Sequence, residues 1–214
     1  MTAGSVLADI GTDHAYIPIW LAENGRIMGA VAMDVNRGPL ERAEENIREH
    51  GLEDRICTRL SDGFAALEPG EADCAVIAGM GGGLTVRILK EGMGLVRTLK
   101  ECILQPQSEI EKVRAFLLEE GFLFISEDMV EEDGKYYPMM KLACPGGKER
   151  LITDEDPPAG DRRENDWDET ELLYGRYLLR DRNPVLRQCL EREIHIKQQS
   201  LEGVADQDYP RRAA

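Results

Sequence analysis

Short apolar runs alternate with amphipathic helical runs along most of the chain, and this alternation constrains the fold more than any other feature of the sequence. Buried parallel strands are continuous apolar runs, and the helices that cover them repeat apolar residues every three to four positions. Their alternation is typical of a mostly parallel sheet with helices on both faces. The runs that we predict as strands one to five are residues 6–10, 28–33, 56–60 and 75–78, and a run anchored by Ile103 and Leu104.

The helices between these strands have recognisable first and last residues. Pro39 lies where it can be the first helical residue of a helix that ends at Gly51. Ser108 and Glu111 have the spacing of a capping box for the helix after strand five. A shorter helix is predicted over residues 18–24. Helices therefore fill the gaps between the strands.

Two further strands follow the last of these helices. They are residues 122–129 and 136–143, joined by an acidic turn that ends in Gly134. Five parallel strands closed by an antiparallel hairpin resemble the layout of class I methyltransferases, whereas dinucleotide-dependent dehydrogenases usually continue with a parallel sixth strand. We therefore expect an α/β, Rossmann-like class I methyltransferase fold with a mostly parallel, seven-stranded sheet.

The composition changes after Cys144, where a polar stretch rich in Pro, Gly and Asp begins. Such a stretch cannot bury a core. We therefore predict a Rossmann-like catalytic domain over residues 1–150, a linker over residues 151–168 and a helical, coiled-coil-like appendage over residues 169–214. A stripe of apolar residues supports the appendage. Its members are Leu186, Leu190, Ile194 and Leu201.

The composition also disfavours several classes of protein and site. No apolar run approaches the roughly 18 residues of a membrane-spanning helix, and the first predicted strand follows Met1 almost at once, without the basic and apolar regions of a signal peptide. We therefore expect a cytoplasmic protein that makes no membrane contact. The five cysteines form no C-x-x-C pair, and Cys57, Cys74 and Cys102 lie in apolar runs. We expect these to be buried thiols and predict no metal site.

The carboxyl ends of strands one to four each offer an acidic residue or a glycine. In a parallel sheet these ends lie along one edge, where ligands bind at the switch in strand order. A glycine there lets a ligand approach the backbone, and a carboxylate accepts hydrogen bonds from a ribose diol or reads an adenine edge. Any one acid alone could be a solvated turn residue, but their joint placement favours a cofactor site. The candidates, in strand order, are Asp9 and Gly11, Asp34 and Val35, Asp62 and Gly63, and Gly79 and Met80.

Residues beside this edge are candidates for the chemistry itself. Asp13 suits an electrostatic partner for a positive charge better than a general base, and His14 suits a proton relay or a helix cap equally well. Tyr16 and Met80 could stack on a planar substrate, although a core role is favoured for both. Gln105 carries an amide that could hydrogen-bond a base edge or only flank a turn.

The formal net charge of −15 argues against indiscriminate nucleic-acid binding, because phosphate contacts depend on Lys and Arg. The charge is uneven, however. Residues 1–161 hold 16 Lys and Arg against 30 Asp and Glu, whereas residues 162–214 hold 10 against 11. Arg176, Arg180 and Arg187 recur at intervals compatible with one helical face, which could follow phosphates or form a solvated face with local salt bridges.

Four motifs occur in colinear order between residues 5 and 145: ADIGTDHAY at residues 8–16, AGMGG at 78–82, LQP at 104–106 and EDGKYY at 132–137. Together they resemble the bacterial tRNA (adenine(22)-N1)-methyltransferases, the TrmK family. The resemblance implies transfer of a methyl group from S-adenosylmethionine to N1 of adenine 22 in tRNA, and a C-terminal helical appendage that helps to hold tRNA. It also implies a cofactor site around Asp9, Gly11, Asp34, Asp62 and Gly79.

Other interpretations stay open at the level of the sequence. An S-adenosylmethionine-dependent methyltransferase that acts on a small molecule or a protein fits the acidic charge, and a requirement for folded tRNA would distinguish the two. A truncated, non-catalytic module would bind cofactor or RNA without turnover. A dehydrogenase is disfavoured by the loop after strand one, which has the single glycine Gly11, and by the terminal hairpin.

Overall fold

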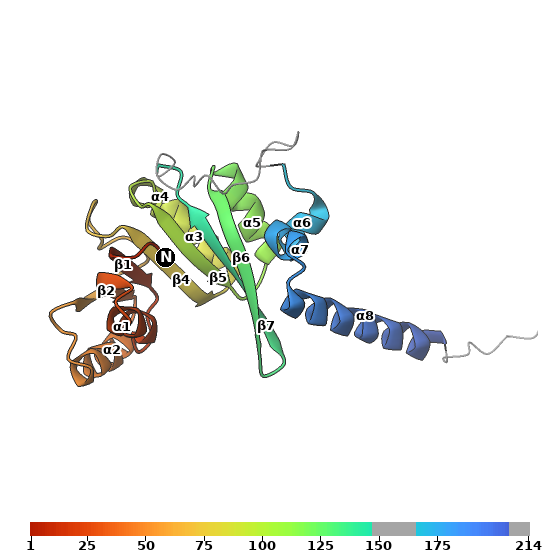
Figure 1. Cartoon of the computed structure of the whole chain (residues 1–214), viewed down its shortest axis with the longest axis horizontal. Helices are drawn as coiled ribbons and strands as arrows, with labels where there is room; N and C mark the ends of the chain where they lie inside the picture. Colours follow the sequence, from red (N-terminus) through yellow and green to blue (C-terminus); the bar gives the residue numbers. More distant parts are fainter. Residues whose placement is uncertain (147–165, 206–214) are drawn as a thin grey trace, which may run out of the picture.

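The computed structural model of the chain describes residues 1–146 and 166–205, the last four as backbone only. Its strands are β1 (Ser5–Ile10), β2 (Ile27–Asp34), β3 (Ile56–Leu60), β4 (Cys74–Met80), β5 (Glu101–Pro106), β6 (Leu123–Glu132) and β7 (Lys135–Ala143). They form a seven-stranded sheet in the order β3-β2-β1-β4-β5-β7-β6 (Figure 1). Strands β1 to β5 pair in parallel, and β7 is antiparallel to both β5 and β6. The predicted fold class and the terminal hairpin are confirmed.

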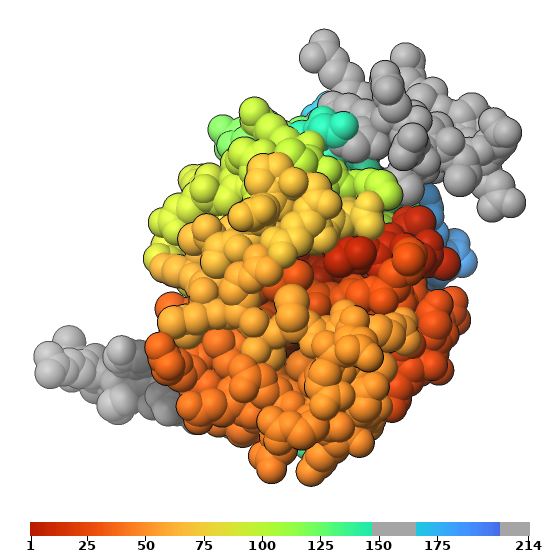
Figure 2. Space-filling model, turned by 90° about the vertical axis from the view of Figure 1, so that its left-hand side faces the viewer, coloured from red at the N-terminus to blue at the C-terminus, as the bar shows by residue number. Residues whose placement is uncertain are grey.

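Helices cover both faces of this sheet. They are α1 (Tyr16–Glu23), α2 (Arg37–Glu49), α3 (Gly82–Glu91), α4 (Met93–Val96), α5 (Ile110–Glu119), α6 (Glu169–Tyr174), α7 (Arg176–Arg180) and α8 (Pro184–Ala205). Alternate strand residues point to opposite faces, so Leu7 of β1 packs with Ile19 of α1 and Ala43 of α2, whereas Ala8 packs in the cluster that holds Leu117 of α5. In Figure 2 the first half of the chain forms one side of the molecule, with the red and orange segments below the yellow and yellow-green ones.

The strand order reverses at the centre of the sheet. The chain runs outward from β1 through β2 to β3, and then returns to the other side of β1 with β4. In open α/β sheets such a switch point leaves a crevice at the carboxyl ends of the strands, because the flanking helices lie on opposite faces. The loops after β1 and β4 therefore meet at the place where the sequence predicts a cofactor.

A buried ion pair docks the C-terminal helices onto the sheet. Arg114 of α5 donates to Glu127 of β6 at 2.9 Å, and both side chains are almost fully buried. The Arg114 guanidinium also donates to the carbonyl oxygens of Leu172 and Leu173 in α6, at 2.8 and 2.9 Å. The second oxygen of Glu127 accepts the Tyr177 N–H of α7. Because backbone groups of α6 and α7 complete the pair, these helices are part of the folded body.

Only the end of the predicted linker lies within the described residues. Trp167 is buried, with its ring centroid 4.4 Å from that of Phe124, and Asp168 forms a capping box with Glu171 at the start of α6. Trp167 is therefore packed against the body, whereas residues 151–165 lie outside the described part. The boundaries of the three predicted parts stay a prediction.

Apart from Arg192, which contacts Gly134 and Tyr136 of the hairpin, the described side chains of helix α8 pack only near its beginning. Leu186 is buried and Leu190 packs beside it, but Ile194 and Leu201 of the predicted stripe are 55% and 71% exposed. Figure 1 shows α8 extending away from the sheet. Within the described residues, no helix is long and apolar enough to cross a membrane.

Three local predictions are wrong. Helix α2 begins at Arg37, two residues before Pro39, which was expected to be its first residue. The Ser108 hydroxyl does not cap α5, which follows Glu109 in a left-handed conformation without a side-chain cap; instead it accepts the Gly82 N–H at 3.2 Å. Cys57 is exposed, although Cys74 and Cys102 are buried as expected. Cys57 lies on edge strand β3, which pairs only with β2, and this explains its exposure.

Candidate active site

The carboxyl ends of β3, β2, β1, β4 and β5 form one continuous edge. Backbone hydrogen bonds tie the loops after the strands together: Gly11 N–H donates to the Met33 carbonyl at 2.7 Å, and Ser61 N–H donates to the Asp34 carbonyl at 2.9 Å. The predicted cofactor residues therefore follow one another along this edge, in the order of the sheet.

Asp9 and Thr12 are buried polar side chains at the end of β1. The Asp9 side chain is 6% exposed, and burial raises the pKa of its carboxyl group to about 6. The Thr12 hydroxyl lies close enough to oppose this rise, but within the described residues it forms no hydrogen bond of normal geometry. Buried polar groups are normally satisfied. These two therefore suit a ligand that brings its own donors and acceptors.

Two glycines with unusual backbone conformations lie where the loops after β1 and β4 meet. Gly11 and Gly79 both have φ of +76°, a conformation that is strained for other residues. A Cβ on Gly11 would lie 2.0 Å from Met80 Cε, so the Met80 side chain lies directly against the β1 loop. Met80 also packs against the core, and the favoured core role for this residue is confirmed.

Asp34 and Val35 follow β2. One carboxylate oxygen of Asp34 accepts the Asn36 N–H at 2.7 Å, and within the described residues the other oxygen receives no hydrogen bond. Val35 is 58% exposed beside it. An exposed apolar side chain next to an available carboxylate suits a ligand with a flat ring and a diol.

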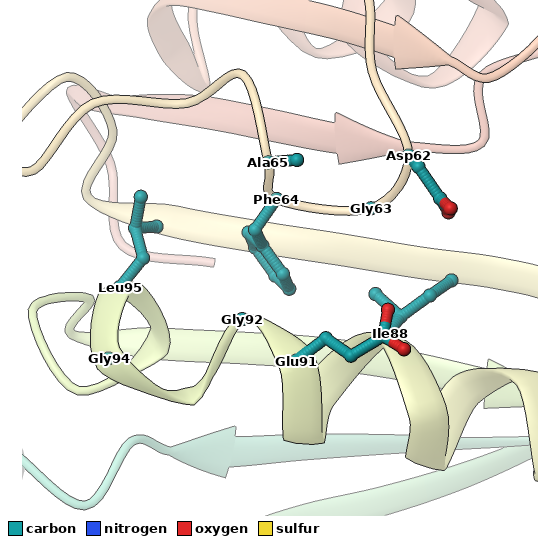
Figure 3. A pocket seen from close by; sticks show the side chains of 9 residues that line it. All are labelled: Asp62, Gly63, Phe64, Ala65, Ile88, Glu91, Gly92, Gly94 and Leu95. Carbon is teal, nitrogen blue, oxygen red and sulfur yellow. The ribbon is translucent and has the colours of Figure 1, made fainter.

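Asp62 and Gly63 lie at the β3 end of the edge and also border a cavity of about 290 Å³. Figure 3 shows that the Phe64 ring points into this space toward Gly92 and that the Asp62 carboxylate points away from it. Asp62 lies 3.2 Å from the Arg87 guanidinium, and both side chains are about half exposed. The cavity touches none of the other predicted cofactor residues, so it adjoins the site but is not its centre.

Asp13, His14 and Tyr16 form an exposed cluster between β1 and α1. Arg42 of α2 donates twice to one oxygen of Asp13, at 2.7 and 3.2 Å, and this hydrogen bonding holds the pKa of Asp13 below its usual value. His14 lies 3.5 Å from Asp13, and its ring is parallel to the ring of Tyr16, with 5.1 Å between centroids. Tyr16 is 64% exposed, so the favoured core role for Tyr16 is wrong. Its ring is available for stacking.

Gln105 is oriented by the glycine loop. Its side-chain oxygen accepts the Gly79 N–H at 2.9 Å, which links the end of β5 to the loop after β4. The prediction that Gln105 binds a base edge is untested, but the amide lies at the correct edge.

The three predicted RNA-binding arginines do not share one helical face. Arg176 and Arg180 belong to α7 and Arg187 to α8, with a left-handed residue at Arg182 between the helices. Arg176 is mostly buried and paired with Glu171. Arg180 and Arg187 are 51% and 80% exposed, and each pairs with a neighbouring acid, Asp181 and Glu191. The single-face expectation is wrong, because the chain turns between α7 and α8.

Arg42 and Asn46 are site residues that the sequence reasoning missed. Arg42 holds Asp13, and Asn46 donates to the His14 carbonyl at 2.9 Å, so α2 fixes the conformation of the β1 loop. They are one helical turn apart, but α2 holds other polar pairs at this spacing, such as Glu41 and Glu45, so the spacing alone does not single them out. Within the described residues, no group of three His, Cys, Asp or Glu side chains could hold a metal ion.

Comparisons with known proteins agree with this geometry. Residues 1–140 match the family model described as a methyltransferase domain. The Bacillus subtilis tRNA (adenine(22)-N(1))-methyltransferase is 32% identical over 94% of this chain and 80% of its own length.

Two solved structures are also similar over nearly the whole chain. The crystal structure of the B. subtilis m1A22 tRNA methyltransferase TrmK has a TM-score of 0.73 and 29% identity, covering 98% of this chain and 84% of that one. The M. capricolum TrmK structure, which contains S-adenosyl-homocysteine, has a TM-score of 0.73 and 25% identity, covering 99% and 85%. The chain belongs to the family of the tRNA (adenine(22)-N(1))-methyltransferases, within the proteins that share a methyltransferase domain.

Proposed function

We propose that this protein transfers a methyl group from S-adenosylmethionine to N1 of adenine 22 in tRNA. The observation that carries the proposal is the extent of the likeness to the B. subtilis enzyme, which covers 94% of the chain and therefore includes both the sheet and C-terminal helices. The M. capricolum relative binds the cofactor product S-adenosyl-homocysteine. We place the reaction in the cytoplasm, where the proposed substrate resides.

The edge residues fit S-adenosylmethionine. Asp34 offers an unbonded carboxylate oxygen for a ribose diol, and the exposed Val35 offers an apolar contact for an adenine ring. Asp9 and the buried Thr12 hydroxyl offer polar partners for the amino-acid portion. When bound, the cofactor supplies an electrophilic methyl group on a sulfonium.

The protein's main tasks are to position the base and to exclude water. In-line displacement requires the nucleophile about 3 to 3.5 Å from the methyl carbon. Adenine N1 already carries an in-plane lone pair, so no base is required before attack, and the cationic product can later release a proton of its exocyclic amine to solvent. Because Arg42 stabilises the ionised form of Asp13, we assign Asp13 an electrostatic role. A base could stack on the Tyr16 ring, which is itself parallel to the His14 ring.

Adenine 22 must be exposed from the folded tRNA before it can reach the active-site edge. Adenine 22 lies within folded tRNA, so the base must be unstacked at a cost of a few kcal/mol. We propose that exposed arginines, Arg187 and Arg180 among them, contact phosphates and help to offset this cost. Arg176 supports the fold of this region, because it is paired with Glu171 and lies 5.0 Å over the Trp167 ring.

Labelled methyl transfer from S-adenosylmethionine tests the proposal. Folded, unmodified tRNA is expected to accept label, whereas tRNA fragments without the folded core, small molecules and bulk protein are not. Label in a small molecule or a protein, with none in tRNA, would support a different methyltransferase. Binding of S-adenosyl-homocysteine without label in any acceptor would support a non-catalytic module.

A further inference from the structure

A cavity of about 440 Å³ lies beside the proposed active site, between the end of β5 and the start of β7. It is lined by Gln107 and by residues 134–137, and its volume is within the range of roughly 300–1,000 Å³ typical of ligand pockets. The register explains it. Strands β5 and β7 pair as far as Leu104, which lies opposite Met140. Beyond this pair, β7 separates from the segment that leads from the end of β5 to α5. The diverging segments leave the space open.

Gln107 lines the cavity and also borders the proposed active site. Its N–H donates to the Met80 carbonyl at 2.8 Å, and its side-chain nitrogen would lie 3.9 Å from a Cβ on Gly79. Gln107 therefore lies between the cavity and the glycine loop. The cofactor residues Asp9 and Asp34 lie on the other side of this loop, on β1 and β2, so the cavity is distinct from the cofactor edge.

The cavity combines a cation with aromatic rings. Lys135 is exposed and forms no ion pair within the described residues, although it faces Glu132 in the hairpin register. Tyr137 lies two residues further along β7, and alternation places it on the same face as Lys135. The Tyr136 ring is occupied by Arg192 of α8, whose guanidinium lies 5.9 Å from it. Tyr137 is therefore the ring that remains available.

Two lysines of the described chain, Lys90 and Lys135, form no ion pair, and the Lys90 ammonium lies 5.3 Å from the centroid of the Phe116 ring. Four others are held in ion pairs, namely Lys100, Lys112, Lys141 and Lys197. The turn acid Glu131 is also engaged, since its carboxylate accepts the Gly134 N–H at 2.7 Å. Lys135 thus offers a positive charge to a ligand in a protein whose net charge is −15.

We propose that this cavity binds a nucleotide of the substrate RNA that flanks the methylated adenine, with Lys135 at its phosphate and the Tyr137 ring against its base. Unstacked RNA bases are recognised by stacking on aromatic side chains, and phosphates by lysines, so both groups suit one nucleotide. The proposal rests on the proposed function, because it takes tRNA as the substrate. It assigns the EDGKYY motif a part in substrate placement.

Steady-state methylation of an unmodified tRNA transcript by the full chain tests the proposal. The variants are Lys135→Ala, Tyr137→Leu and Tyr137→Phe. Lys90→Ala is the matched control, because Lys90 also lacks an ion pair within the described residues but lies at the end of α3 opposite to the active-site edge. We expect Lys135→Ala and Tyr137→Leu to raise the KM for tRNA about tenfold. Tyr137→Phe, which keeps the ring, should recover most of the affinity for tRNA that Tyr137→Leu loses. Lys90→Ala should stay near wild type, and affinity for S-adenosyl-homocysteine should be unchanged in all four.

The salt dependence of tRNA binding separates a phosphate contact from a structural effect. Lys135→Ala should reduce the slope of log Kd against log salt concentration by about 1, and Lys90→Ala should not. An unchanged KM in Lys135→Ala and Tyr137→Leu, or an equal loss in Lys90→Ala, would overturn the proposal. If Tyr137→Leu does not fold, the slope of log Kd against log salt concentration for Lys135→Ala tests the proposal by itself. If the wild-type chain methylates no tRNA, the proposed function fails, whereas the binding measurements still test the cavity.

Discussion

Asp9 shows how folding can prepare a single side chain for a ligand. Burial at the end of β1 raises the pKa of its carboxyl group from 3.8 to about 6. Between these values the folded protein retains a proton that the unfolded chain has lost. The contribution of this group to the free energy of unfolding is therefore greatest below pH 4 and is lost as the pH rises to about 6.

Replacing Asp9 with Asn should remove this pH dependence. At pH 7 we expect the free energy of unfolding to rise by up to about 3 kcal/mol, because the variant no longer buries a charge. Urea unfolding between about pH 4 and pH 8 measures the effect, with Asp54→Asn in an exposed loop as the control. A variant that keeps the wild-type pH profile would contradict the buried-carboxylate interpretation.

Asp34→Ala tests the cofactor edge at a second residue. The lost hydrogen bonds to a charged acceptor should weaken binding of S-adenosyl-homocysteine by about ten- to a hundredfold. The melting temperature should change little, because the carboxylate makes only the local bond to Asn36. Calorimetric titration measures the affinity, with Asp54→Ala as the control. Equal affinities in the variant and the wild type would remove Asp34 from the site.

At the scale of elements, one ion pair joins the sheet to the C-terminal helices. Arg114→Met leaves Glu127 buried without its partner, so it should cost about 3–5 kcal/mol of the free energy of unfolding. Arg114→Met combined with Glu127→Leu should lose much less. Urea unfolding measures stability, and hydrogen exchange in α6 and α7 reports their release. A cost below about 1 kcal/mol for the single variant would show that other contacts dock these helices.

The arginines of α7 and α8 should separate into structural and RNA-binding residues. Arg176→Ala should lower the free energy of unfolding by about 1–3 kcal/mol, because it removes the Glu171 pair and the contact with Trp167. Arg187→Ala should leave stability unchanged, since Arg187 is 80% exposed, and should weaken tRNA binding in a salt-dependent way. Thermal melting and filter binding measure the two effects. The opposite assignment of the two residues would contradict this division.

Elements were predictable from the sequence where burial imposes a pattern. Strand β1 was expected at residues 6–10 and spans Ser5–Ile10, because its residues are almost all buried and a continuous apolar run is typical of a central parallel strand. Contacts between distant elements were not predictable. Ser108 has the local spacing of a cap, but α3 begins beside it and its hydroxyl bonds to Gly82 instead. In the same way, Arg42 reaches Asp13 across 29 residues only once α2 packs beside the β1 loop.

At the scale of the whole molecule, the sheet gathers the site and the C-terminal helices extend the surface on one side. The switch in strand order brings the β1 and β4 loops together, and the divergence of β5 from β7 opens a second cavity next to them. The net charge of −15 requires that contacts with RNA be local, through a few exposed cations. Lys135 and Arg187 are two such cations, on the hairpin and on α8.

The position of the transferred methyl group tests the central claim most directly. Unmodified tRNA is incubated with the protein and S-adenosylmethionine, digested with a base-specific ribonuclease and analysed by mass spectrometry, beside a transcript in which adenine 22 is replaced by guanine. The account predicts one added methyl group, recovered as 1-methyladenosine in the fragment that contains position 22 and absent from the substituted transcript. A methyl group at another position, or equal methylation of both transcripts, would contradict it.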